Sequence, residues 1–537
     1  MEHSFIQLID LPDEILVNIF KKLNDVEVLY SLMGVNQRLS KIVCDSMFTN
    51  RLTLLRYLWN GFIFPLSRIV LDRFCLQILP EIHHKIQWLN LESLSMERIL
   101  FAADYPNLRG LGLYNINQKT AVHFFMGEQI LTRTFKNQIS TVIITISNKK
   151  EDLSAKIEIM TVCSHIFTAF PNLLYLNFHQ SSDRQIDRLS FDCQIPMFCS
   201  TLLELHIKVQ RFDDILYLLD GRFNKLCIFY VDVINIACTR TSLPMINNNE
   251  RLSNMKCFSM TSSCETCFYD ELIVPLLQRM LNLEKLVLNF AANCQKTFID
   301  GNNLKTNIFN HMSRLNIFTF NIRSKISFYD QMNLLSNEDI KNTLTNLGDD
   351  YKINCCVDYF PKEKTGQCHI YSYPYSLTYY DNITNNFSGG LFKYVHNVSL
   401  FDERPFEHEF FIRITHAFPF LKQLTINNLT PQNHKQYENL NNNQDLPIIK
   451  YPYLTELDFI DVHDDYIEQF LVNTKTYLSN YIHTIIDYNS LQRVTHNFTR
   501  EATRINCYKF SRLIFCDVLD LPKHIVDYFP HAEIIIF

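Results

Sequence analysis

The first clear pattern in the sequence is an apolar periodicity of helical type near the N-terminus. Apolar residues recur at offsets of 0, +1, +4, +5 and +8, a spacing that places them on one side of an α-helix. They are Ile15, Leu16, Ile19, Phe20 and Leu23. Pro12 precedes them at a position that suits a first helical turn, and Asp13 and Glu14 lie at the positive end of the helix dipole. We predict an amphipathic helix that opens at about residue 11.

Two more short helices follow. Asn24 with Glu27 three residues later has the form of a capping box, so a second helix with Leu29 and Leu32 on its apolar side should begin there. A third helix is predicted from about residue 35 to about residue 44. Three short helices enclose little apolar surface, and a domain this small usually needs a partner, a metal or a disulfide. The N-terminal module therefore implies a partner.

From residue 86 a different apolar pattern repeats: an apolar residue, two variable ones, a second apolar residue, one variable and a third apolar residue. The middle apolar residues of the strong copies are Leu111, Leu176, Leu205, Leu286, Leu424 and Leu457. Weaker copies centre on Leu89, Val142, Phe229, Phe258, Phe318, Val398, Ile485, Tyr508 and Ile535. An aromatic residue and proline introduce several copies, and helical stretches precede some of them. Since proline disfavours the helical region for the residue before it, we predict helix, turn and short strand in each unit.

Two regions differ from this pattern. Residues 51–85 carry helical periodicity, so we predict a helical connector there. Residues 321–394 interrupt the repeats and contain two β-prone runs, Ile353–Phe360 and His369–Tyr375, around Pro361–Gln367. These runs predict a β-hairpin, which serves either as a recognition element or as a cap on an exposed sheet edge. The predicted organisation is thus 1–50, 51–85 and 86–537, with an insertion at about 321–394.

Composition excludes several function classes. The chain has 537 residues and a net charge of −6, which offers no attraction for a polyphosphate, so we expect no nucleic-acid partner. Only 11 residues are glycine, and phosphate-binding, nucleophile and dinucleotide motifs that need glycine are absent. Cys264 and Cys267 form a lone CxxC without the second ligand pair that structural zinc requires. We expect no catalytic residue, no cofactor and no metal.

The sequence also suggests a compartment. Its first residues lack the basic start of a signal peptide, and nowhere do eighteen apolar residues run together. The 16 cysteines suit reduced, mostly buried thiols. We expect no membrane segment and a location in the cytoplasm or nucleus.

The N-terminal residues resemble an F-box. The resemblance rests on Leu11-Pro12-x-Glu14-Ile15-Leu16, Ile19-Phe20, Leu23, Leu29, Leu32 and Val35-Asn36-x-Arg38-Leu39. In that family the module docks onto the small Skp-type adaptor of cullin–RING ubiquitin ligases. The resemblance implies adaptor-binding roles for Leu11, Pro12, Ile15, Leu16, Ile19, Phe20, Leu23, Leu29, Leu32 and Val35. The alternative is an ordinary helical hairpin packed on its own chain.

The repeated pattern resembles leucine-rich repeats, which implies an α/β solenoid in which each unit buries its apolar side against the next. The asparagine or cysteine usual after each strand is replaced by Ile116, Ala291, Leu429 and Val462, so we expect no asparagine ladder. The central variable position of each strand should face the concave side, and most of these residues are uncharged, polar or small. We hypothesise that His206, Tyr230 and Asp458 contribute to a protein-binding surface there.

These resemblances imply a non-catalytic substrate-recognition subunit of an SCF-type E3 ubiquitin ligase. Its F-box would bind the Skp-type adaptor and the cullin–RING core, and its repeats would bind a target protein. The main alternative is an intracellular repeat scaffold without a ligase role. A hydrolase or metal enzyme on a repeat frame is disfavoured by the missing motifs.

Overall fold

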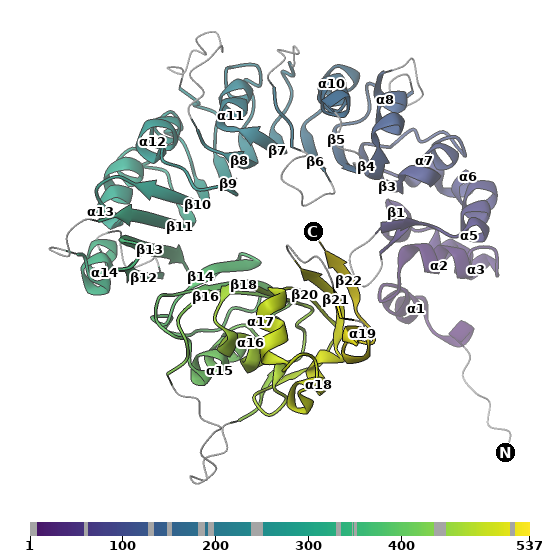
Figure 1. Cartoon of the computed structure of the whole chain (residues 1–537). Coiled ribbons are helices and arrows are strands. Elements are labelled where there is room, and N and C mark those ends of the chain that lie inside the picture. The colour runs from purple at the N-terminus through teal and green to yellow at the C-terminus, as the bar shows by residue number, and fades with distance from the viewer. Residues whose placement is uncertain are drawn as a thin grey trace. The chain divides into compact units, whose positions relative to one another are not determined.

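In the computed structural model, the chain divides into two compact units. One contains Met1–Ala292 and Thr306–Phe318, and the other contains Asn293–Lys305 and Thr319–Phe537 (Figure 1). The structure describes residues 8–57, 63–126, 134–147, 153–180, 188–191, 198–237, 251–328, 334–345, 347, 352–433, 447–515, 521–522 and 524–536. Each unit is treated below by itself.

The first unit begins with a small helical module. It consists of η1 (Leu8–Asp10), α1 (Asp13–Phe20), α2 (Asp25–Leu32), α3 (Gln37–Val43) and α4 (Ser46–Thr49). The Asn24 side chain accepts the N–H of Val26 at 2.9 Å and the Asn36 side chain accepts the N–H of Leu39 at 2.7 Å, so asparagine caps begin α2 and α3. The three helices predicted from the sequence are confirmed, and the very short α4 follows them.

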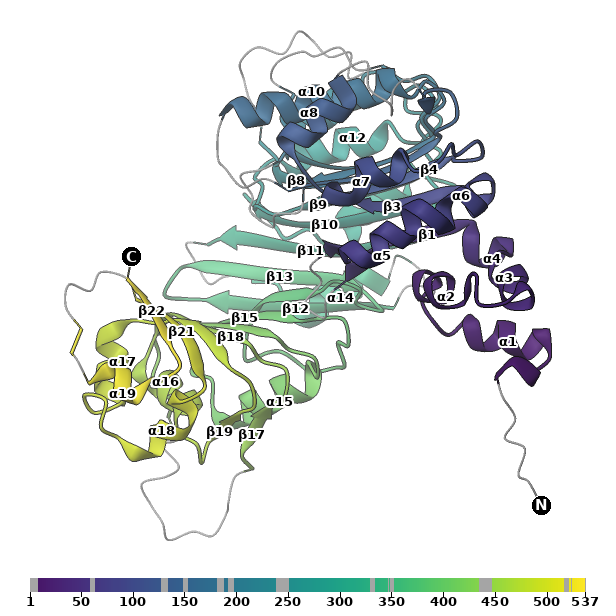
Figure 2. The same ribbon diagram turned by 90° about the vertical axis from the view of Figure 1, so that its right-hand side faces the viewer.

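The helical module is attached directly to the α/β part of its unit (Figure 2). The Lys85 ammonium donates to the carbonyl of Cys44 at 2.8 Å. The Arg73 guanidinium donates to the carbonyl of Met33 at 2.9 Å and lies 4.8 Å from the centre of the Tyr30 ring. Such charge-assisted and cation–π contacts fix the module at both α2 and α3.

Residues 51–85 are not a purely helical connector, so that prediction was wrong for its first part. The segment contains β1 (Arg51–Tyr57) and β2 (Ile63–Pro65), followed by α5 (Arg68–Arg73), η2 (Phe74–Ile78), α6 (Leu79–Ile82) and η3 (His83–Lys85). Leu52 and Leu54 are fully buried. Their alternation with polar neighbours is a strand signal, and it outweighs the helical spacing of the same leucines. The sheet thus begins where the helical module ends.

The first unit contains a large, mostly parallel sheet whose strands follow the chain order. After β1 come β3 (Trp88–Glu92), β4 (Gly110–Asn117), β5 (Thr141–Ser147), β6 (Tyr175–Gln180), β7 (Glu204–Arg211), β8 (Ile228–Asn235), β9 (Cys257–Ser262) and β10 (Lys285–Cys294). The middle apolar residues predicted from the sequence lie in one continuous register row. From β1 to β10 the row reads Leu52, Leu89, Leu111, Val142, Leu176, Leu205, Phe229, Phe258 and Leu286.

Helices cover one face of this sheet (Figure 1). They are α7 (Ser93–Leu100), α8 (Gln118–Met126), α10 (Leu153–Ala169), α11 (Phe212–Leu218), η5 (Tyr269–Ile273) and α12 (Val274–Gln278). The register row of apolar residues is buried. Because side chains alternate along a strand, the residues between the apolar ones point to the opposite face. That opposite face is called the open face of the sheet below.

An asparagine ladder joins turns that precede the strands, at positions other than the ones after each strand to which the prediction applied. In four places an asparagine side-chain amide donates to a backbone carbonyl in the preceding turn. The pairs are Asn107 with His84 (2.6 Å), Asn172 with Asn137 (2.7 Å), Asn254 with Asn224 (2.7 Å) and Asn282 with Ser253 (2.8 Å). The ladder lies before each strand instead of after it, and it satisfies carbonyl groups that would otherwise lack a partner.

The second unit contains a seven-stranded parallel sheet with helices packed on it. Its strands are β14 (Tyr379–Ile383), β15 (Asn397–Phe401), β16 (Gln423–Asn428), β18 (Glu456–Val462), β20 (Ile482–Ile485), β21 (Phe510–Phe515) and β22 (Glu533–Ile536). β17 (Ile449–Tyr451) and β19 (Thr476–Leu478) form a small separate pair. The helices are α13 (Gly301–Leu304), α14 (Asn337–Thr345), α15 (His408–Ala417), α16 (Asp464–Leu471), α17 (Tyr488–Val494), α18 (Glu501–Cys507) and α19 (Ile525–Tyr528), and the π-helical η6 (Lys305–Phe309) connects α13 to the end of the first unit.

The last three weak copies of the repeat were misplaced. In β20 the buried residue next to the predicted position is Thr484, which is 1% exposed, whereas the predicted Ile485 is 39% exposed. Thr484 is in register with Leu513, and Leu513 with Ile534. The predicted Tyr508 lies before β21, and the predicted Ile535 is one residue out of step. A buried threonine interrupts the apolar pattern here, and its hydroxyl donates to the Leu457 carbonyl.

The predicted β-hairpin is confirmed. β12 (Ile353–Phe360) and β13 (Thr365–Ser372) pair antiparallel, and β13 also pairs antiparallel with β11 (Ile317–Ser327). The second strand begins at Thr365, four residues earlier than predicted. The Glu403 carboxylate accepts the backbone N–H groups of Lys362 and Glu363 at 2.9 and 2.8 Å. The tip of the hairpin is thus held within its own unit.

The described residues hold no candidate membrane span and no candidate group of metal ligands. None of the helices in these residues is long and apolar enough to cross a membrane. In the same residues, no three His, Cys, Asp or Glu side chains gather as metal ligands would.

Candidate functional site

One candidate site is an apolar surface on α1. Ile15, Ile19 and Leu23 follow one another at intervals of four residues, so they lie in a line along one side of the helix and its C-terminal end. Their exposed fractions are 45%, 38% and 52%. These three residues are called the apolar stripe below. Large aliphatic side chains exposed in a line are typical of a surface that another protein covers.

The other residues predicted to bind the adaptor divide into two groups. Pro12 and Val35 are exposed, and Leu11 and Leu32 are half-buried. The structure gives Leu16, Phe20 and Leu29 a different role, because they are 0%, 1% and 0% exposed. These three side chains form the core of the module itself, and the adaptor contacts assigned to them stay a prediction.

The amphipathic pattern explains this division. The apolar residues of α1 cover an arc wider than the module can bury. Leu16 and Phe20 point inward, where Phe20 meets Phe48 with ring centres 6.5 Å apart. The apolar stripe lies beside these two residues on the surface of α1 and remains exposed to solvent. The sequence showed the arc but not which edge of it faces the protein's own core.

A contact between α1 and α3 holds the stripe in place. The Arg38 guanidinium donates to the Asp13 carboxylate at 2.8 Å and to the carbonyl of Leu11 at 2.6 Å. The ion pair is exposed, so its own contribution to stability is small. Its main effect is on geometry, because the Arg38 side chain joins the start of α1 to α3.

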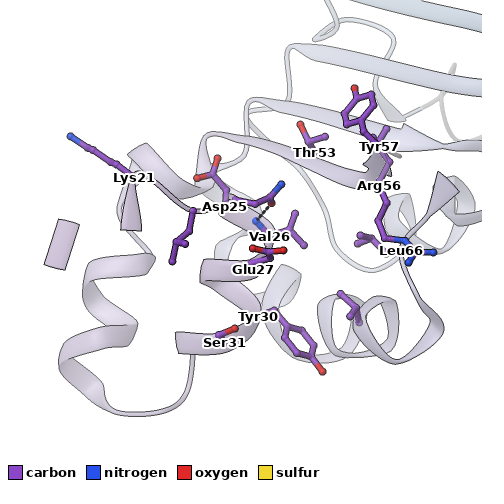
Figure 3. A pocket seen from close by; sticks show the side chains of 14 residues that line it. Lys21, Asp25, Val26, Glu27, Tyr30, Ser31, Thr53, Arg56, Tyr57 and Leu66 are labelled. Atoms are coloured by element: carbon purple, nitrogen blue, oxygen red, sulfur yellow. Dashed lines mark hydrogen bonds between the residues drawn. The ribbon is translucent and has the colours of Figure 1, made fainter. Parts of the chain in front are cut away.

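A cleft of about 850 Å³ lies at the end of the stripe (Figure 3). One wall comes from the α1–α2 connection and the start of α2, with Leu23, Asn24 and Asp25. The far side comes from β1, with Thr53, Leu55, Arg56 and Tyr57, from Leu66 between β2 and α5, and from Val70 of α5. Burial raises the pKa of Asp25 above its ordinary value. The cleft therefore combines residues of the helical module with residues of the sheet.

Comparison with known proteins identifies the helical module. Residues 8–51 match the family described as F-box domain. These residues form an F-box domain. The F-box predicted from the sequence is therefore confirmed. Its match ends at Arg51, the first residue of β1, so the F-box and the sheet adjoin without a spacer.

Two other comparisons give little for the rest of the chain. No curated protein matches the sequence. A solved structure, described as the crystal structure of the Rad7 and Elc1 complex in yeast, is similar over 78% of this chain and 84% of that chain. The sequence identity is 13% and the TM-score is 0.27.

A second candidate surface lies on the open face of the sheet in the first unit. Three rings from adjacent strands, Tyr175, His206 and Tyr230, lie side by side and are called the ring row below. The His206 and Tyr230 rings are stacked, and the Tyr175 ring is tilted by 42° against that of His206. The His206 ring centre is 5.3 Å from that of Tyr175 and 4.3 Å from that of Tyr230. His206 Nε2 is 2.7 Å from the Glu204 carboxylate. The row presents stacked aromatic surface with a carboxylate beside it.

The sequence pattern pointed to His206 and Tyr230 but missed Tyr175. Tyr175 lies in register with Glu204, two residues before the central position of its strand. It shares the open face because side chains two residues apart in a strand point the same way. Burial raises the pKa of Tyr230 to about 12, and the Cys257 thiol lies 3.6 Å from its hydroxyl.

Asp458 belongs to the second unit and is no part of the ring row. It lies on β18 and accepts the N–H of Ile485 at 3.1 Å and the side-chain amide of Gln423 at 3.5 Å. Burial raises the pKa of its carboxyl group. Asp458 therefore links three neighbouring strands, so its contacts serve the sheet of the second unit.

Proposed function

We propose that this protein is a substrate-recognition subunit of an SCF-type E3 ubiquitin ligase. The F-box binds the Skp-type adaptor of a cullin–RING ligase, and the α/β part holds a target protein. The observation that carries the proposal is the apolar stripe, which is exposed on a domain of the F-box family. In this role the protein has no catalytic residue of its own and acts in the cytoplasm or nucleus, by bringing the target close to the ubiquitin-charged enzyme.

We also propose that the α/β part is built from leucine-rich repeats. Support comes from the unbroken register of apolar residues from Leu52 to Leu286, and from the helices on one face of the sheet. The asparagine ladder before the strands gives further support. The target-binding surface in this proposal is the ring row on the open face, where stacked rings and a carboxylate suit a protein segment better than a charged polymer.

The direct test is titration of the purified full-length chain with a purified Skp-type adaptor. Replacing Ile15 and Ile19 together by aspartate places charges on the stripe, and we expect binding to be lost. The matched control is Ile69→Asp, because Ile69 is 74% exposed on α5 and outside the F-box. Binding that survives the double substitution would refute the assigned interface. If the unaltered chain does not bind the adaptor, the ligase role fails.

One observation favours a second function, an intracellular scaffold without a ligase role. The contacts of Arg73 and Lys85 fix the F-box firmly to the α/β part, as expected of a module that only caps the sheet. A module that only covers the end of the sheet would not require an exposed apolar stripe. The ligase role accounts for the stripe, whereas the scaffold role does not. The adaptor titration distinguishes the two functions.

A further inference from the structure

We infer that the cleft at the end of the apolar stripe binds a second segment of the adaptor, so that residues of β1 and α5 outside the F-box match help to hold it. This inference rests on the proposed function. It adds a contact site beyond the stripe and names residues that the F-box match does not include.

The cleft is continuous with the apolar stripe. The stripe runs along α1 through Ile15 and Ile19 to Leu23, and Leu23 also lines the cleft. A partner that covers the stripe and extends beyond Leu23 enters the cleft without leaving the surface. Eight of the 14 lining residues belong to the F-box, so most of the cleft is part of the same module as the stripe.

The far side of the cleft is fixed relative to the F-box, because Arg73 at the end of α5 donates to Met33 and lies over Tyr30. Val70 is one helical turn earlier in α5 and lines the cleft. A preformed cleft costs a partner little ordering, so contacts in it add to the binding free energy.

The F-box wall of the cleft carries two acidic side chains. Asp25 and Glu27 lie at the F-box wall, and neither forms an ion pair within the part of the chain that the structure describes. Of the lining cations, Lys21 points away from the other side chains in Figure 3, and Arg56 Nε donates to the Pro65 carbonyl at 3.1 Å. The cleft thus suits a segment with a basic side chain for the two acids and an apolar side chain for Leu23 and Val70.

A segment of the target protein is the competing occupant. Thr53, Leu55 and Tyr57 alternate along β1, so the open face of the sheet continues into the cleft. The larger F-box share of the lining and the shared Leu23 favour the adaptor. The experiment below separates the two occupants.

The test measures the affinity of the full-length chain for the purified Skp-type adaptor by calorimetry. Val70→Arg fills the cleft and supplies its own cation, and we expect an affinity loss of about tenfold or more. The matched control is Ile69→Arg, which puts the same charge on the same helix but outside the cleft, and should bind as the unaltered chain does. Tyr57→Ala, at a side chain that is 58% exposed, should weaken binding severalfold even if Val70→Arg misfolds.

The outcomes are distinct. If the adaptor binds and both cleft variants match the unaltered chain, the inference is overturned while the proposed function stands, and the target becomes the occupant to examine. If only the cleft variants weaken binding, the inference is supported. The double variant Asp25→Asn with Glu27→Gln should weaken adaptor binding more at low salt than at high salt. An unchanged affinity would show that no basic side chain of the adaptor pairs with these two acids. No adaptor binding by the unaltered chain removes the proposed function and this inference together.

Discussion

Asp214 makes the stability of the first unit depend on pH in a specific way. It lies in the first turn of α11 and is 2% exposed. Its carboxylate accepts the N–H of Phe191 at 2.6 Å and the N–H of Arg211 at 2.8 Å. These hydrogen bonds favour the charged form, but burial outweighs them and raises the pKa from 3.8 to about 6.

The sign and size of the effect follow from this shift. Between pH 3.8 and about 6 the folded chain holds a proton on Asp214 that the unfolded chain has released. The stabilisation is therefore complete below pH 3.8 and is lost as pH rises through about 6. At about 1.4 kcal/mol for each pH unit, the free energy of unfolding falls by about 3 kcal/mol over this range.

The assay is urea unfolding of the unaltered chain and of Asp214→Asn from pH 4 to pH 7.5, followed by circular dichroism. The amide does not titrate, and it keeps one of the two accepted hydrogen bonds. Other carboxyl groups titrate in both proteins and cancel in the comparison. Between pH 4 and pH 7.5 we expect the stability of the unaltered chain relative to the variant to fall by about 2.5 kcal/mol. A difference that stays constant across the range would refute the reasoning.

Three further predictions concern the core, the turns and the open face. Leu16→Ala should lower the free energy of unfolding by about 2–5 kcal/mol in thermal or urea unfolding, because Leu16 is fully buried, whereas Ile15→Ala should leave it within about 1 kcal/mol. Asn172→Ala should cost about 1 kcal/mol in the same measurement, because it removes one bond of the ladder. Replacing His206 and Tyr230 together by alanine should remove target proteins from affinity captures with the full-length chain, while adaptor affinity in calorimetry stays unchanged. Captures that retain every target would contradict the role of the ring row.

The sequence predicted the F-box helices and most strands because their signals are local. Asparagine caps and the spacing of Ile15, Leu16 and Ile19 depend only on neighbours in the chain. The middle leucines fall into one register because each strand repeats the same alternation of buried and open positions. These features need no knowledge of distant contacts.

Other features depend on contacts that the chain order does not reveal. Leu52, Leu54 and Leu55 fit both a helix and a strand, and pairing with β3 decides between them. Leu16 and Ile15 are neighbours of similar hydrophobicity, and only the packing of α1 on Phe48 makes one of them core and the other surface. Tyr175 and the cleft were missed for the same reason, since both arise where separate strands and helices meet.

Because the F-box adjoins the sheet directly, the distance from the F-box to any strand of the first unit is set by the spacing between strands. Neighbouring strands in a sheet lie about 4.8 Å apart, and β6 and β8 are the fourth and sixth strands from β1. The ring row therefore begins about 20 Å from the F-box, measured across the strands, and ends about 10 Å farther. In the proposed function, a target held there would be presented at a set distance from the adaptor-bound F-box, so only lysines within a limited zone of its surface could receive ubiquitin. Inserting or deleting one repeat between β3 and β6 would move that zone by a single strand spacing.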